Sequence, residues 1–142
     1  MKDKFKEYVL ISPAKENDYI NVEWAFKAFY KKMDDGGFSC YIPAYDIHFS
    51  AKDFEAVKVK SNDIMFMYFD HFFIHKKNGL KLIALQLHKL GFKTNNDMMT
   101  MKELVKNHAV IANFKPNKEI IAPPEFINAA VINQKAEMEM AI

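Results

Sequence analysis

The side chains best suited to hold a metal ion are Asp70, His71 and His75, which lie within six residues of one another. Imidazole nitrogens and carboxylate oxygens are common ligands of zinc and iron. Two histidines four residues apart share one face of a helix, as a metal pair requires, but a strand separates them by about 13 Å. Whether the two histidines can bind one metal ion therefore depends on whether they lie on a helix or on a strand. A small metal-dependent enzyme stays open as one alternative.

Other reactive residue types are scarce. Cys40 is the single cysteine and lies in an apolar stretch, where a cysteine usually packs as a small hydrophobe. The four glycines form neither a phosphate-binding loop nor a dinucleotide-binding motif. We therefore predict that the protein is not an enzyme and uses no cofactor. Because one cysteine cannot form an intramolecular disulfide, we expect a reducing compartment and a cytoplasmic protein.

Charge gives little indication of a nucleic-acid partner. The 142-residue chain has a net charge of +2, and all 20 of its basic residues are lysines. Arginine is the usual residue for bidentate base recognition, so sequence-specific DNA reading is disfavoured. Lys76 and Lys77 are left as weak, non-specific nucleic-acid contacts. No apolar stretch reaches the ~20 residues of a membrane helix, so we expect no membrane partner. The oligomeric state is left open.

The first half of the chain predicts strands around one helix. The apolar run Glu7–Ser12 indicates a buried strand. Apolar residues recur at helical spacing over Val22–Met33, and two glycines follow, so we expect a helix there. The segment Phe38–Phe49 is expected as an edge or bulged strand because Pro43 lies inside it.

The next segment admits two interpretations. Alternation over Glu55–Lys60 favours a strand, Ser61–Asp63 has the composition of a turn, and Ile64–Phe69 reads as a second strand. A helix beginning near Ser61 and ending before Gly79 is the alternative. We favour strands because aromatic and β-branched residues dominate.

On that strand, one face would carry Ile64, Phe66 and Tyr68. An aromatic strip left exposed on a sheet is more often a partner site than an accident. Coverage of this strip by other side chains is the alternative. These residues are therefore the candidate partner-binding patch.

The second half predicts a helix over Gly79–Leu90, a short helix over Thr100–Asn107, a strand over Ala109–Phe114 and a last helix opened by Pro123–Glu125. The fold class predicted is α/β (α+β), with a single sheet of about four strands and helices mainly on one face. We expect one domain over residues 1–133, with an inserted helical segment at about 71–107, and a flexible tail over 134–142.

Several runs resemble the N-terminal (NGN) domain of NusG-type transcription factors, and RfaH-like paralogues most of all. Tyr8–Leu10 resembles the family's opening strand, and Phe38–Pro43 resembles the strand after its first helix. Val57–Asp70 resembles the following strand pair. Val110–Phe114 and Ile121–Phe126 resemble the closing pattern. No KOW domain follows in this sequence.

The resemblance implies a transcription elongation or antitermination factor. Such domains bind the clamp region of RNA polymerase through an apolar patch, which would here comprise Ile64 and Phe66 with Phe114 nearby. Tyr68 shares that predicted face. Another protein-binding module, such as an immunity protein, an inhibitor or an adaptor, remains the alternative because it would use the same strip on a different partner.

Overall fold

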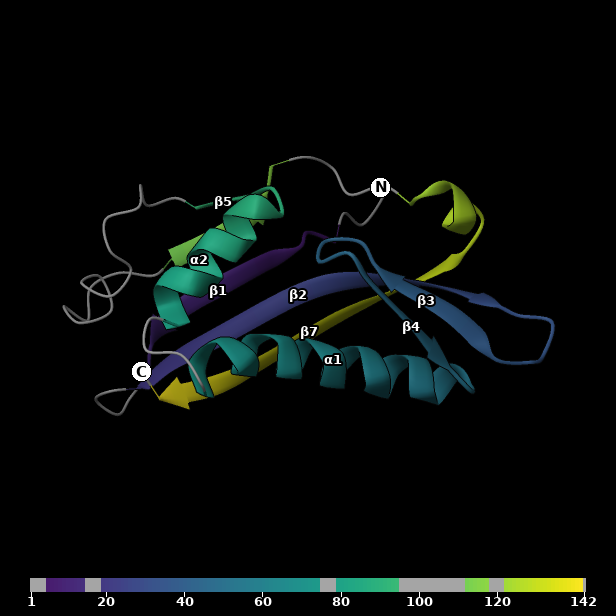
Figure 1. Ribbon diagram of the computed structural model, residues 1–142, viewed down its shortest axis with the longest axis horizontal. Coiled ribbons are helices and arrows are strands. Elements are labelled where there is room, and N and C mark those ends of the chain that lie inside the picture. Colours follow the sequence, from purple (N-terminus) through teal and green to yellow (C-terminus); the bar gives the residue numbers. More distant parts are fainter. Residues whose placement is uncertain (1–4, 15–18, 75–78, 95–111, 118–121, 142) are drawn as a thin grey trace.

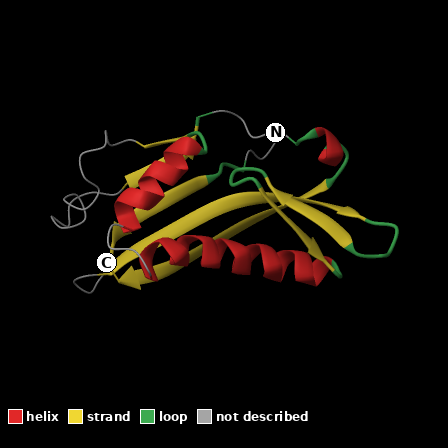
Figure 2. Ribbon diagram, viewed as in Figure 1, coloured by secondary structure: helices red, strands yellow, loops and turns green. Residues whose placement is uncertain are grey.

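The computed structural model describes residues 5–14, 19–74, 79–94, 112–117 and 122–141 (Figure 1). Within these ranges the chain forms seven strands, two α-helices and one short 3₁₀-helix (Figure 2). The strands are β1 (Tyr8–Pro13), β2 (Tyr19–Lys32), β3 (Phe38–Ile42), β4 (Ile47–Ala51), β5 (Phe92–Thr94), β6 (Ala112–Pro116) and β7 (Ala130–Ala141). The helices are α1 (Phe54–Ile74), α2 (Gly79–Lys89) and η1 (Pro124–Phe126).

The long strand β2 organises a single antiparallel sheet. It pairs with β7 over residues 19–30, while β1 pairs with residues 20–25 and β3 with residues 29–32. Since a strand has two edges, β1 and β3 share the edge opposite β7. The remaining order is β4-β3-β2-β1-β6-β5. The sheet curls into a half-barrel, and α1 lies along it beside β7 (Figure 1).

The core lies between the concave face of the sheet and the helices. Alternate residues of β2 point into it and are fully buried, namely Ile20, Val22, Trp24, Phe26 and Ala28. From α1, Val57, Met65 and Phe69 are buried, and α2 adds Ile83, Ala84 and Leu87. The helix α1 contacts β3, β4 and β7, and α2 packs on α1 and β5. Neither of the two α-helices described has both the length and the apolar character needed to cross a bilayer.

The predicted fold class was wrong. The sheet has seven antiparallel strands rather than about four, and it curls into a half-barrel (Figure 1). The largest error concerns Val22–Met33, which was expected as a helix and lies mostly in β2. So many of its residues are apolar that they fit a period of 3.6 as well as a period of 2. The segment forms a strand because its backbone pairs with three neighbouring strands, β1, β3 and β7.

A second error exchanges strand for helix in the opposite direction. The strands expected over Glu55–Lys60 and Ile64–Phe69 are both part of the 21-residue helix α1, and Ser61–Asp63 is not a turn. Residues at intervals of four are buried along α1, and they include Ser61. This burial shows the helical period that the aromatic composition concealed. The helix alternative was therefore correct in type, although its start is earlier than Ser61.

The third group of errors lies near the C-terminus. Among the described residues after Pro123, only η1 is helical, and residues 134–141, expected as part of a flexible tail, lie in β7. The expected strand at 38–49 is divided into β3 and β4 by a turn that follows Ile42. The strand at Glu7–Ser12 and the helix at Gly79–Leu90 agree with β1 and α2 to within one residue at each end. The short helix expected over Thr100–Asn107 lies outside the described residues.

Candidate partner-binding surface

The four residues predicted as a partner patch do not share one surface. Ile64, Phe66 and Tyr68 belong to α1, where a step of two residues turns the side chain by about 200°. Phe66 is 46% exposed, but Ile64 and Tyr68 are half-buried against the core. Phe114 is on β6 and only 2% exposed. Phe66 is therefore the single predicted patch residue that is freely available to a partner.

The outer side of α1 carries a different apolar group. Val59, Phe66 and Met67 are 56%, 46% and 62% exposed. Their spacing of seven and eight residues places them on one side of the helix, with Val59 two turns, or about 10 Å along the axis, before Phe66 and Met67. The solvent side of a helix that closes a core is usually polar, so three large apolar side chains there need an explanation. We call these residues the α1 apolar patch.

Local hydrogen bonds fix the start of α1 before this patch. Asp53 is the N-cap, because its Oδ1 accepts a bond of 2.8 Å from the N–H of Ala56. Glu55 in the first turn pairs with Lys58 at 3.0 Å, and its negative charge suits the positive end of the helix dipole. Lys58 also lies over the ring of Phe54. These contacts give α1 a defined first turn.

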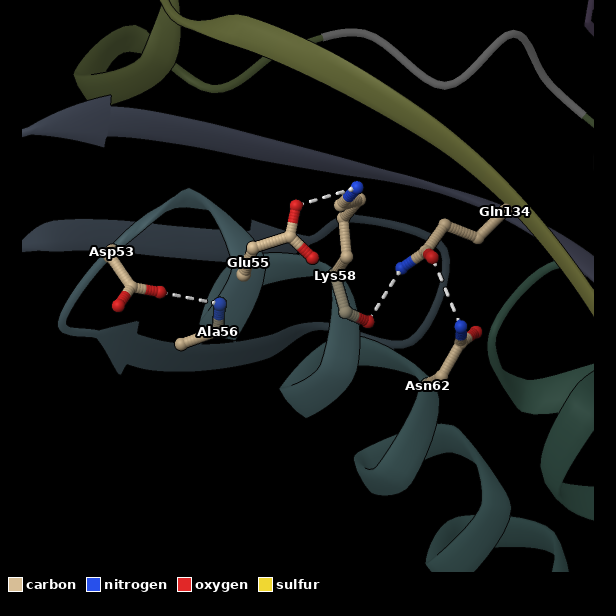
Figure 3. Close-up of polar contacts among 6 residues, drawn as sticks. All are labelled: Asp53, Glu55, Ala56, Lys58, Asn62 and Gln134. Carbon is tan, nitrogen blue, oxygen red and sulfur yellow. Dashed lines mark hydrogen bonds and ion pairs between the residues drawn. The ribbon is translucent and has the colours of Figure 1, made fainter.

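Gln134 of β7 fastens α1 to the sheet (Figure 3). Its Nε2 donates to the backbone oxygen of Lys58 at 3.1 Å and also to Ser61 Oγ. Its Oε1 accepts a bond of 3.0 Å from Asn62 Nδ2. Ser61 is fully buried and donates in turn to the Lys58 oxygen at 3.0 Å. The α1 apolar patch is thus carried by a helix with a fixed position, which lowers the ordering cost of binding.

Polar groups also lie inside the core, around the ring of Phe69. The rings of Trp24, Tyr45 and Tyr68 lie 4.7, 5.9 and 5.4 Å from that of Phe69. Trp24 Nε1 and the Tyr45 hydroxyl are buried and have no hydrogen-bond partner of ordinary geometry among the described residues. The Glu7 carboxyl is buried as well. A buried polar group without a partner costs roughly 1–3 kcal/mol, so this cluster is a costly part of the core.

Electrostatics link Glu7 to this cluster. Burial raises the pKa of the Glu7 carboxyl to about 7, against the lowering effect of Lys27. Burial also raises the pKa of Tyr45, and the charge of Glu7 acts in the same direction. Burial raises the pKa of Tyr68, while the side chain of Gln86 lowers it. These shifts favour the neutral forms of all three groups inside the half-barrel.

Of the residues considered for metal or catalytic chemistry, the structure describes Asp70, His71 and Cys40. Asp70 and His71 are near the end of α1, whereas His75, Lys76 and Lys77 lie outside the described residues. No group of three or more His, Cys, Asp or Glu side chains with metal-binding geometry occurs in the described ranges. Cys40 is buried in β3, and burial raises the pKa of its thiol to about 11. A protonated, buried thiol is a poor nucleophile.

Sequence reasoning missed Val59, Met67 and Gln134. The first two were assigned to strands, where they would alternate with their neighbours. The available signal in the sequence was the spacing of Val57, Met65 and Phe69 at multiples of four residues, which is typical of one side of a helix. Gln134 could not have been found, because its partners on α1 are more than 70 residues away.

Comparison with known proteins gave no match to a protein-family model, to a curated protein or to a solved structure.

Proposed function

We propose that this chain is a protein-binding module whose partner covers the α1 apolar patch. The observation that supports this most directly is the exposure of Val59, Phe66 and Met67 on one helix. Single exposed apolar residues are common on protein surfaces, but a group of them marks an interaction site. The class of function is that of an inhibitor, immunity protein or adaptor, which acts by occupying a partner rather than by chemistry.

The attachment of α1 supports this proposal. A partner that docks on a helix loses affinity if the helix must first be ordered. The bonds from Gln134 to Lys58 and Asn62 hold the first half of α1 against β7. The buried contacts of Met65 and Phe69 hold the second half. The patch is therefore presented in one position before the partner arrives.

A role as a transcription elongation or antitermination factor remains a prediction, which the comparisons do not test. The surface expected for RNA polymerase was an extended strip, and Ile64 to Phe69 is helical instead. Only Phe66 of the expected contacts is exposed beyond a third. The proposal therefore rests on the exposed side of α1 and not on an extended strip. The free, buried Cys40 suits a reducing compartment, which supports a cytoplasmic site of action.

The experiment compares Phe66→Asp with a matched control, Leu85→Asp. Leu85 lies on α2 and is 41% exposed, close to the 46% of Phe66, so both substitutions place a carboxylate at a similar helix surface. Proteins captured by the wild-type chain from its own cells are quantified against both variants. Burying one such side chain contributes about 1.5–3 kcal/mol, so Phe66→Asp should reduce capture of a true partner at least about tenfold.

Leu85→Asp should leave that capture unchanged. Equal retention of every captured protein by wild type, Phe66→Asp and the further variant Met67→Asp would refute the proposal. Circular dichroism spectra of the three variants show whether each one is folded.

A further inference from the structure

The strand β7 has an edge that no strand occupies within the described part of the chain. Its twelve residues pair with β2 along one side only. The other side carries backbone N–H and C=O groups that can pair with a further strand. An edge of this length is unusual, because most edge strands are short or interrupted by a bulge or a proline. A strand that fits this edge has to match its side chains as well as its backbone.

Charges on the convex face of β7 are unbalanced within the monomer. Glu137 lies directly opposite Glu23 in the β2–β7 register, and like charges in that position are unfavourable. Asn21 donates a hydrogen bond of 3.4 Å to Glu137, but the described residues place no lysine nitrogen within 4.0 Å of its carboxylate. Lys135 is two residues away, with its ammonium 5.9 Å from the Tyr8 ring centre. Glu137 would therefore gain from a cation on its open side.

The sequence of β7 supplies that cation when the strand pairs with itself. In an antiparallel pair of two copies centred on Ala136, Lys135 of each copy faces Glu137 of the other. Centring on Lys135 would place two lysines opposite each other, and centring on Glu137 would place two glutamates opposite each other. On the concave face, the same centre at Ala136 pairs Ile132 with Met140.

We propose that two copies of this chain form a symmetric dimer by antiparallel pairing of their β7 edges, with the two-fold axis at Ala136. The sheets of both copies then form one continuous sheet, because residues of the same face meet across the axis. Both α1 helices lie on the same side of it. The dimer goes beyond the proposed function, since it would offer a partner two α1 apolar patches at once and so increase avidity.

The first test measures the dimer dissociation constant of the full chain by analytical ultracentrifugation. Glu137→Lys creates two Lys–Lys contacts across the axis, and we expect at least about tenfold weaker association. The double variant Lys135→Glu with Glu137→Lys restores opposite charges and should recover most of the association. Lys52→Glu, which changes an exposed lysine outside β7, is the control and should associate as the wild type does.

The second test checks the register. Ala136→Cys places two thiols opposite each other at the axis and should form a disulfide-linked dimer on mild oxidation. Val131→Cys should not, because position 131 then lies far from its counterpart in the other copy. A wild-type chain that is monomeric throughout, or equal cross-linking at both positions, would overturn the proposal. Either result would leave the Phe66 experiment unaffected, so failure of the dimer is distinguishable from failure of the proposed function.

Discussion

Asn62 of α1 donates its side-chain N–H to the side-chain oxygen of Gln134 on β7, across 3.0 Å. The strand β7 has 12 residues, and the helix α1 that packs beside it has 21. Within the described structure, the side-chain hydrogen bonds from β7 to α1 are made by Gln134. Ile132, Ala136 and Met138 of β7 are half-buried against the core. Because the Gln134 amide bonds to the buried Ser61 and to Asn62, losing it would leave polar groups at this contact without a partner.

Gln134→Ala should destabilise the fold by about 1–3 kcal/mol, because it leaves buried groups of Ser61 and Asn62 without their partner. Chemical denaturation followed by tryptophan fluorescence measures this loss, since the single Trp24 lies in the core. The neighbouring variant Asn133→Ala changes an exposed side chain of β7 and should stay within about 0.5 kcal/mol of wild type. Equal effects at the two positions would show that Gln134 does not fasten α1.

The sequence predicted the parts of this fold in which one period dominates. The α2 helix has a clean stripe of Ile83, Ala84 and Leu87, and Gly91 after it adopts a φ of +95°, which suits glycine at a helix end. The apolar run that forms β1 likewise fits a strand pattern. In both cases local pattern and tertiary position agree, so the pattern alone was sufficient.

The parts that failed are those in which local pattern is ambiguous. In β2, Ala25 and Phe29 are buried in addition to the alternate residues, so a helical period fits the same sequence. In α1, Val59 and Phe66 are apolar but exposed, which blurs the helical stripe. The residues that confuse the period in α1 are the ones we assign to partner binding, and for that reason the site and the misprediction coincide.

Glu7 should make the stability of the fold depend on pH. The pKa of its carboxyl rises from 4.5 to about 7 on folding, so the native state prefers the protonated form. The stabilising contribution is complete below about pH 4.5 and is lost as the pH rises to about 7. The free energy of unfolding, compared with that of Glu7→Gln, should therefore fall by roughly 3 kcal/mol over this interval.

Urea denaturation of both chains at pH 4.5, 6 and 8 measures this difference. Glu139→Gln is the matched control, because it makes the same substitution at an exposed position of β7. It should show no comparable change. A difference between wild type and Glu7→Gln that stays constant with pH would contradict the burial of an ionisable carboxyl at this position.

Cys40 should be unreactive in the native protein. It is fully buried, and burial raises the pKa of its thiol to about 11, so very little thiolate is present at pH 8. A thiol reagent added at pH 8 should react completely only after denaturant is added. Ser39→Cys, whose side chain is half-buried in the same strand, should react faster than Cys40. Rapid labelling of the native wild-type chain would show that β3 opens readily.

The most direct test of the partner-binding account is site-specific photo-crosslinking in the cells that produce this chain. A photoreactive phenylalanine analogue replaces Phe66 in one variant, Met67 in a second and Leu85 of α2 in a third. We predict one shared protein adduct at positions 66 and 67 and its absence at 85. The same adducts at all three positions, or none at 66 and 67, would contradict the claim that α1 is the surface a partner covers.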